Sequence, residues 1–171
     1  DATKAETSLV KAVTDYTMMS SSEQKALRTS GALAAELGVN IEDYAKGVQN
    51  SMKMFGQSVG DAIAVQGELA ATARMLGRDQ GEFAAEFAAS GQALAKFGDQ
   101  GVKAFKDLQH IAKITGMEMN KLLNITNKFD TFEGAAEQAG KLNAALGGNF
   151  VNAMDLMMTT DPAERFSMIR D

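Results

Sequence analysis

Apolar residues recur at helical spacing along most of the chain. Residues 41–55 give the clearest case, since an apolar side chain returns there every three or four positions. This spacing places the apolar side chains on one face of an amphipathic helix. A first stripe covers residues 3–19, and further stripes run through 59–76, 83–97 and 102–112. The pattern predicts an all-α chain.

Serines and glycines mark the ends of the predicted helices. Ser20 and Glu23 have the spacing of a capping box, as do Ser21 and Gln24. A helix is therefore predicted from this serine run to about Leu37, with a stop at the following glycine. Near the end of the chain, residues 161–164 read Asp-Pro-Ala-Glu, a strong helix start. Because that last helix is cut short, we expect the chain to be a fragment of a longer polypeptide.

Three glycines suggest an internal repeat. Gly38, Gly77 and Gly116 are spaced 39 residues apart, and aligning them also superimposes Tyr44, Phe83 and Leu122. A period of about 40 residues is typical of helical-hairpin repeats. Chance agreement among alanine-rich helices is the alternative. The sequence thus predicts an array of helical hairpins with short glycine-rich connections, in which 39-residue repeats are one reading.

The same pattern divides the chain into four stretches. Residues 1–37 form N-terminal helices, and residues 38–115 form two helical-hairpin units. Residues 116–148 form a third, divergent unit, and residues 149–171 form a short helix and the start of a truncated one. Glycines within the predicted helices, such as Gly67 and Gly91, each cost about 1 kcal/mol relative to alanine. Close helix–helix approach, or a segment that must bend, would justify keeping them.

Composition limits how much these helices can bury. Hydrophobic residues make up 45% of the chain, but only 6% are aromatic and 11 are Met. Narrow stripes of small side chains remove little apolar area from water. We therefore expect a marginal monomer that depends on partner chains, as a homo-oligomer. The candidate helix-packing or partner-interface residues are Tyr44, Val48, Phe55, Phe83, Phe87, Leu94, Leu122, Phe129, Leu146 and Phe150.

Charge and cysteine content exclude several classes of protein. The net charge is −5, whereas nucleic-acid-binding domains carry a basic footprint, so no specific nucleic-acid site is predicted. The absence of cysteine excludes disulfides and thiolate zinc sites. No run approaches the roughly 18 consecutive apolar residues of a transmembrane helix, so none is predicted in this piece.

Candidate catalytic chemistry comes down to one histidine. His110 is the only histidine, so a Ser-His-Asp site would depend on it alone. A metal site would need further ligands at a spacing such as HExxH, which the sequence lacks. His110 follows Asp107 by three residues within an amphipathic stripe, so we interpret it as a helix-surface residue. The prediction is a protein that is not an enzyme, without catalytic residues, cofactor or metal.

The glycine units resemble those of a known family. Residues 37–45 read Leu-Gly-Val-Asn-Ile-Glu-Asp-Tyr-Ala, with looser copies at 76–84 and 115–123. This pattern, together with the stretch from Phe129 to Arg165, resembles bacteriophage tail tape-measure proteins of large contractile-tailed phages. The resemblance covers roughly residues 30–171. It brings no catalytic motif with it.

The resemblance implies a structural role in a virion. Tape-measure proteins are long, mostly helical chains that set tail length inside the tail tube and contact the baseplate or hub. The implied partners are tail-tube and baseplate-hub proteins, and the implied location is the phage tail, assembled in the bacterial host cytoplasm. The long hydrophobic segment common in that family is missing here. The alternative is a cellular helical-repeat adaptor that binds a protein partner.

Overall fold

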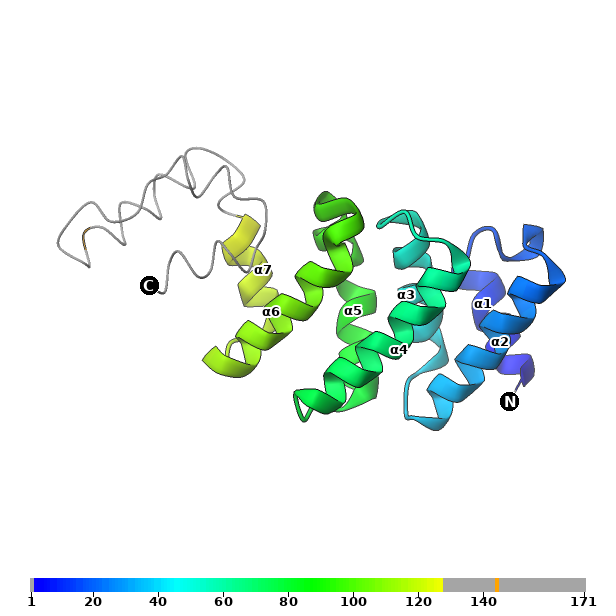
Figure 1. Ribbon diagram of the computed structural model, residues 1–171, viewed down its shortest axis with the longest axis horizontal. Helices are drawn as coiled ribbons and strands as arrows, with labels where there is room; N and C mark the ends of the chain where they lie inside the picture. Colours follow the sequence, from blue (N-terminus) through cyan, green and yellow to red (C-terminus); the bar gives the residue numbers. More distant parts are fainter. Residues whose placement is uncertain (1, 128–143, 145–171) are drawn as a thin grey trace. The chain divides into compact units, whose positions relative to one another are not determined.

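The computed structural model describes residues 2–127 and residue 144 (Figure 1). Within those residues the ordered elements are all helical and no β-strand occurs, so the predicted all-α class is confirmed. The elements predicted from residue 128 onward, including the whole 149–171 stretch, lie outside the described residues. The described helices are α1 (Ala2–Ala12), η1 (Tyr16–Met18), α2 (Ser21–Glu36), α3 (Ile41–Lys53), α4 (Val59–Met75), α5 (Gln80–Leu94), η2 (Ala95–Gln100), α6 (Gly101–Thr115) and α7 (Met119–Asn127).

The chain divides into two compact units, residues 1–106 and 107–171, and the division falls within α6. In the first unit α1, α3 and α5 lie side by side, while α2 and α4 pack against them and against each other (Figure 1). Successive helices are joined by short connections, which is how helical hairpins are built. The unit is therefore an array of packed helical hairpins. The 39-residue repeat itself stays a prediction.

Side-chain caps start four of these helices. The Ser20 hydroxyl accepts a hydrogen bond from the Glu23 amide at 3.3 Å, and the Glu23 carboxylate accepts one from the Ser20 amide at 2.9 Å. The predicted Ser20–Glu23 capping box is thus confirmed. The alternative Ser21–Gln24 box does not form, because the Gln24 side-chain Nε2 donates instead to the Tyr16 and Met19 carbonyls.

The other three caps follow the same logic. Asn40 caps α3 by accepting from the Glu42 amide at 2.8 Å, and Ser58 caps α4 by accepting from the Asp61 amide at 3.1 Å. Asp79 caps α5 through the Glu82 amide at 2.9 Å. Each cap satisfies a backbone N–H that the first helical turn leaves unpaired.

Two predicted glycine stops have the backbone geometry that only glycine adopts at low cost. Gly38 and Gly77 have φ values of 86° and 65°, and each follows a helix end. The residue after each glycine donates its amide to a carbonyl five positions back, Val39 to Ala34 at 3.0 Å and Arg78 to Ala73 at 2.8 Å. This is the Schellman arrangement, which pairs the last carbonyls of a helix.

The first predicted helix is shorter than the sequence pattern indicated. The stripe predicted a helix over residues 3–19, but α1 ends at Ala12 and only a short 3-10 turn follows. The reason lies in α3, where the Gln49 side-chain oxygen accepts the Thr14 amide at 3.2 Å. The Gln49 amide nitrogen also donates to the Thr14 hydroxyl at 2.6 Å. A contact between segments 35 residues apart therefore replaces the helical bond that would have continued α1.

Aromatic rings form the centre of the first unit. Phe83, Phe87 and Phe105 are fully buried. The Phe105 ring meets Phe83 at 5.2 Å and Phe87 at 5.1 Å between centroids, both edge-to-face. Phe55 adds a tilted contact to Phe87 at 5.9 Å. Such pairs add about 0.5–1.5 kcal/mol each beyond the burial of their area.

Glycines on neighbouring helices make room for large side chains of the α3 region. A Cβ on Gly31 would lie 2.9 Å from the Ile41 side chain and 3.2 Å from the Tyr44 ring. A Cβ on Gly91 would collide with the Asn50 amide, which donates to the Ala88 carbonyl of α5 at 3.0 Å. Close helix approach therefore explains these glycines.

Gly67 does not share this role, since nothing lies within 4 Å of the position of its Cβ.

The second unit is described over residues 107–127. Leu108 and Gln109 of α6 are fully buried, as are Leu122 and Thr126 of α7. Gly116, with a φ of 71°, lies between the two helices. The helices α3, α5 and α7 begin at 41, 80 and 119, so their starts keep the 39-residue interval of the glycines.

Gly91→Ala is expected to destabilise the chain by about 1–3 kcal/mol, because the added methyl displaces the Asn50 amide from its backbone partner. Gly67→Ala is the matched control on an exposed helix face. It is expected to stabilise by up to about 1 kcal/mol, through helix propensity alone. Urea unfolding of the whole chain, followed by circular dichroism, measures both. Equal effects of the two variants would contradict the packing described for Gly91.

Candidate functional site

The predicted interface residues lie inside the molecule wherever the structure describes them. Phe129, Leu146 and Phe150 fall outside the described residues. The remaining seven are at most 2% exposed, so they serve helix packing within this chain and are not presented to a partner. These seven are Tyr44, Val48, Phe55, Phe83, Phe87 and Leu94 in the first unit and Leu122 in the second.

The large apolar side chains that do reach the surface are different ones. Leu33 lies in the last turn of α2 and Leu37 directly follows the helix, and the two side chains are 56% and 49% exposed. They fall outside the buried stripe of α2, which contains Leu27 and Gly31. Sequence reasoning missed this pair, although leucines at i and i+4 beside a buried stripe are the signal for a second apolar face.

Leu33 and Leu37 border a cavity between α2 and α4, which we call the α2–α4 cavity. Its volume is about 290 Å³. Ile63 and Gly67 line it from α4, and Tyr44 lines it from α3. This volume lies near the lower end of the range for small-molecule pockets, which is about 300–1,000 Å³. The cavity is therefore suited to a single apolar group, such as one side chain.

Two buried polar atoms belong to residues that line the α2–α4 cavity. The Gln66 amide nitrogen and the Gln80 amide oxygen have no hydrogen-bond partner in the part of the chain that the structure describes. A buried polar atom without a partner costs about 1–3 kcal/mol.

The Tyr44 hydroxyl is also the most strongly perturbed titratable group among the described residues with a resolved shift. Burial raises the pKa of Tyr44 to about 12, and the neighbouring Ser30 hydroxyl opposes the shift. A neutral phenol is therefore held at the cavity well into the alkaline range. In this state it can donate or accept a hydrogen bond, but it cannot act as a base near neutral pH.

The residues considered for catalysis do not gather in the described structure. His110 is exposed on α6. Across residues 2–127 and 144, no three His, Asp or Glu side chains form a group that could hold a metal ion. None of the helices in that part of the chain is both long enough and apolar enough to span a bilayer.

Comparison of the chain with protein-family models, with curated proteins and with solved structures finds no match in any of the three.

Tyr44→Phe is expected to change how stability depends on pH. The unfolded chain loses the Tyr44 proton near pH 10, whereas the folded chain holds it to about pH 12. Between these values the folded state binds more protons, so stability falls as pH rises, by up to about 1.4 kcal/mol per pH unit. The phenylalanine variant lacks this term. Urea unfolding from pH 8 to pH 11.5 is expected to show the wild type losing stability faster than Tyr44→Phe, and parallel curves would contradict the burial of the hydroxyl.

Proposed function

We propose that this chain is a structural segment of a phage tail tape-measure protein, which sets tail length and packs inside the tail tube or against the baseplate hub. One observation carries the proposal. The motif on which the family resemblance rests occupies a defined interhelical turn, which recurs along the chain. In this reading the 39-residue units are true repeats.

Each part of the motif has a structural role in the first two 39-residue stretches, which begin at Gly38 and Gly77. Gly38 and Gly77 end one helix in the left-handed conformation, and Asn40 and Asp79 cap the next. Four residues after each cap, an aromatic side chain is fully buried, Tyr44 in one unit and Phe83 in the other. Chance similarity among alanine-rich helices does not require that the left-handed glycine, the helix cap and the buried aromatic side chain occur at matching positions.

A recurring turn of this kind suits a protein whose own length sets the length of an assembly. If the 39-residue units are repeats, each uses the same number of residues and a glycine stop followed by a helix start, so units can be added or removed without redesigning the ends of the helices. The internal contacts of one hairpin are then copied in the next. A length-setting protein needs this modularity, because the number of residues must translate into a reproducible dimension of the assembly.

The exposed apolar side chains support association with other chains. In the first unit the large ones are Val10, Met18, Leu33, Leu37 and Met75, and Met18 is 86% exposed. Exposed methionine and leucine side chains are typical of adaptable protein interfaces. We therefore retain a homo-oligomer, or contacts with tail-tube and hub proteins, as part of the proposal.

In-frame deletion of residues 77–115 from the parent protein tests the length-setting role. The deletion joins Leu76 directly to Gly116, so a glycine still ends one helix before the next helix begins. Tails produced with the shortened protein are expected to be shorter by a reproducible increment, measured by electron microscopy. Gly67→Ala in the same protein is the control and is expected to leave tail length unchanged. Tails of normal length after the deletion would overturn the proposal.

A second candidate function is a helical-repeat adaptor that binds a protein partner, and the α2–α4 cavity favours it. Under this reading the cavity receives an apolar anchor from the partner, as in helix-in-groove recognition.

Gly67→Leu separates the two functions, because open space lies at the position of its Cβ and a leucine there would fill the cavity. Peptides selected for binding to the folded chain are expected to lose at least tenfold in affinity for this variant if the adaptor reading holds. Gly60→Leu, two turns earlier on α4 and outside the cavity, is the matched control. Selected peptides that bind Gly67→Leu as tightly as the wild type would exclude the cavity as an adaptor site.

A further inference from the structure

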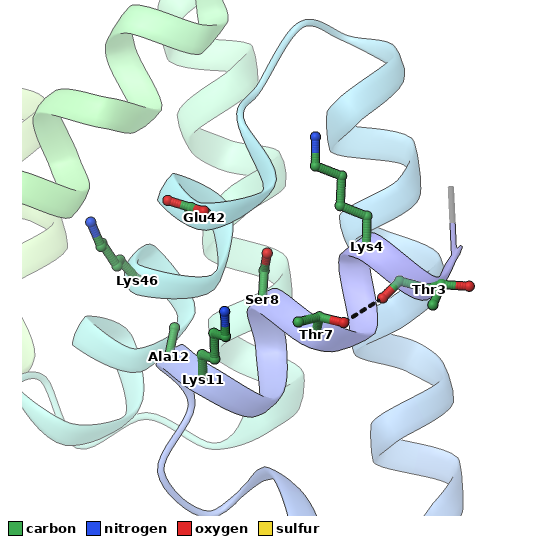
Figure 2. Close-up of a pocket in the computed structure, with 8 residues that line it drawn as sticks. All are labelled: Thr3, Lys4, Thr7, Ser8, Lys11, Ala12, Glu42 and Lys46. Carbon is green, nitrogen blue, oxygen red and sulfur yellow. Dashed lines mark hydrogen bonds between the residues drawn. The ribbon is translucent and has the colours of Figure 1, made fainter.

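A second concave surface lies between α1 and the first turns of α3, and we call it the α1–α3 groove. Its volume is about 720 Å³. Figure 2 shows Lys4, Ser8 and Lys11 extending from one face of α1, with Glu42 and Lys46 beside them on α3. The groove belongs entirely to the first unit and is separate from the α2–α4 cavity.

The groove is positively charged on a chain that is acidic overall. Three lysines and one glutamate line it, which leaves an excess of two positive charges, whereas the whole chain carries a net charge of −5. A cleft lined by one sign of charge concentrates ligands of the opposite sign. The groove therefore favours ligands that carry negative charge.

None of the three lysines forms an ion pair with another described residue. Lys4, Lys11 and Lys46 are exposed and take part in no ion pair among residues 2–127. By contrast, other cations of the first unit have carboxylate partners within the same unit. These pairs are Arg28–Glu6, Lys53–Asp15, Arg78–Glu86 and Lys106–Glu68.

Helix geometry places the charges in two facing rows. Lys4 and Lys11 are seven residues apart on α1, which is two helical turns or about 10 Å along the axis. Glu42 and Lys46 are four residues apart on α3 and so share one face of that helix. A ligand in the groove would meet lysines from both helices at separated points, with Glu42 among them.

Hydroxyl groups between the lysines add hydrogen-bond capacity. The Thr7 hydroxyl donates to the Thr3 carbonyl at 2.9 Å, so its hydrogen is already used (Figure 2). The Ser8 hydroxyl makes no hydrogen bond within the described residues, although Ser8 is only 9% exposed. It can therefore donate to an oxygen of a ligand that enters the groove.

We propose that the α1–α3 groove binds an acidic segment of a protein partner, whose spaced carboxylates contact Lys4, Lys11 and Lys46. The separation of the lysines and the presence of Glu42 favour a ligand with few, spaced negative charges. Nucleic acid fits less well, because it carries a charge about every 1.7 Å of duplex and a single strand needs aromatic side chains on which its bases can stack. Among the described residues, no aromatic side chain lines the groove. The inference goes beyond the tape-measure proposal and does not depend on it.

The test uses the full chain and a fluorescent peptide of three Glu-Ala-Ala-Ala repeats, with binding followed by fluorescence anisotropy. Binding is expected at 25 mM salt and is expected to weaken as salt is raised, because the lysines are exposed and screened. The double variant Lys11→Glu/Lys46→Glu is expected to lower affinity at least tenfold. Circular dichroism is expected to show unchanged helicity, since neither lysine has a partner to lose. A peptide of three Lys-Ala-Ala-Ala repeats is expected not to bind.

Lys25→Glu/Lys113→Glu is the matched control, because it changes the net charge equally at two exposed lysines outside the groove. It is expected to bind the glutamate peptide within twofold of the wild type. An equal loss of affinity in this control would overturn the proposal, since the attraction would then reflect net charge alone. Failure of the wild type to bind the peptide at 25 mM salt would also overturn it. Tighter binding of a ten-nucleotide oligothymidine, lost in Lys11→Glu/Lys46→Glu, would replace the acidic protein partner with nucleic acid.

Discussion

The first unit depends on the close contact of large α3-region side chains with glycines on neighbouring helices. Asn50 fits against Gly91 of α5, and Phe55 fits against Gly101 at the start of α6. Because a Cβ at either glycine would collide with these side chains, the spacing of the helices depends on residues that have none. The aromatic cluster around Phe87 can then close, since its rings come from segments that these contacts hold together.

This packing determines which surfaces remain for function. The aromatic and branched side chains of the helical stripes are used internally, so they offer nothing to a partner. What remains outside is a small apolar cavity beside Leu33 and Leu37 and a basic groove that contains Lys11 and Lys46. Both are formed by side chains from more than one helix.

The two proposals draw on different features of the same unit. The tape-measure proposal rests on the backbone of the turns at Gly38 and Gly77, which makes the units modular. The acidic-partner proposal rests on unpaired charge between α1 and α3, which is a property of one place in the chain. A modular scaffold can carry a unique binding surface at one unit without loss of its regularity.

Local interactions explain why much of the fold could be predicted from sequence. The Ser20 capping box and the Gly38 stop involve groups within a few residues, so their patterns alone determined the positions of the helix ends. Only the tertiary structure decided where α1 ends, because the bond from Thr14 reaches Gln49 across 35 residues. The sequence also determined that Tyr44 belongs to an apolar face.

Only packing decided that this face is buried within the chain and not presented to a partner. The same holds for the α1–α3 groove, because Lys46 is distant in sequence from Lys4 and Lys11 and comes near them only when α3 packs against α1. Pairings between remote segments depend on the arrangement of whole helices, which periodicity along one helix cannot specify.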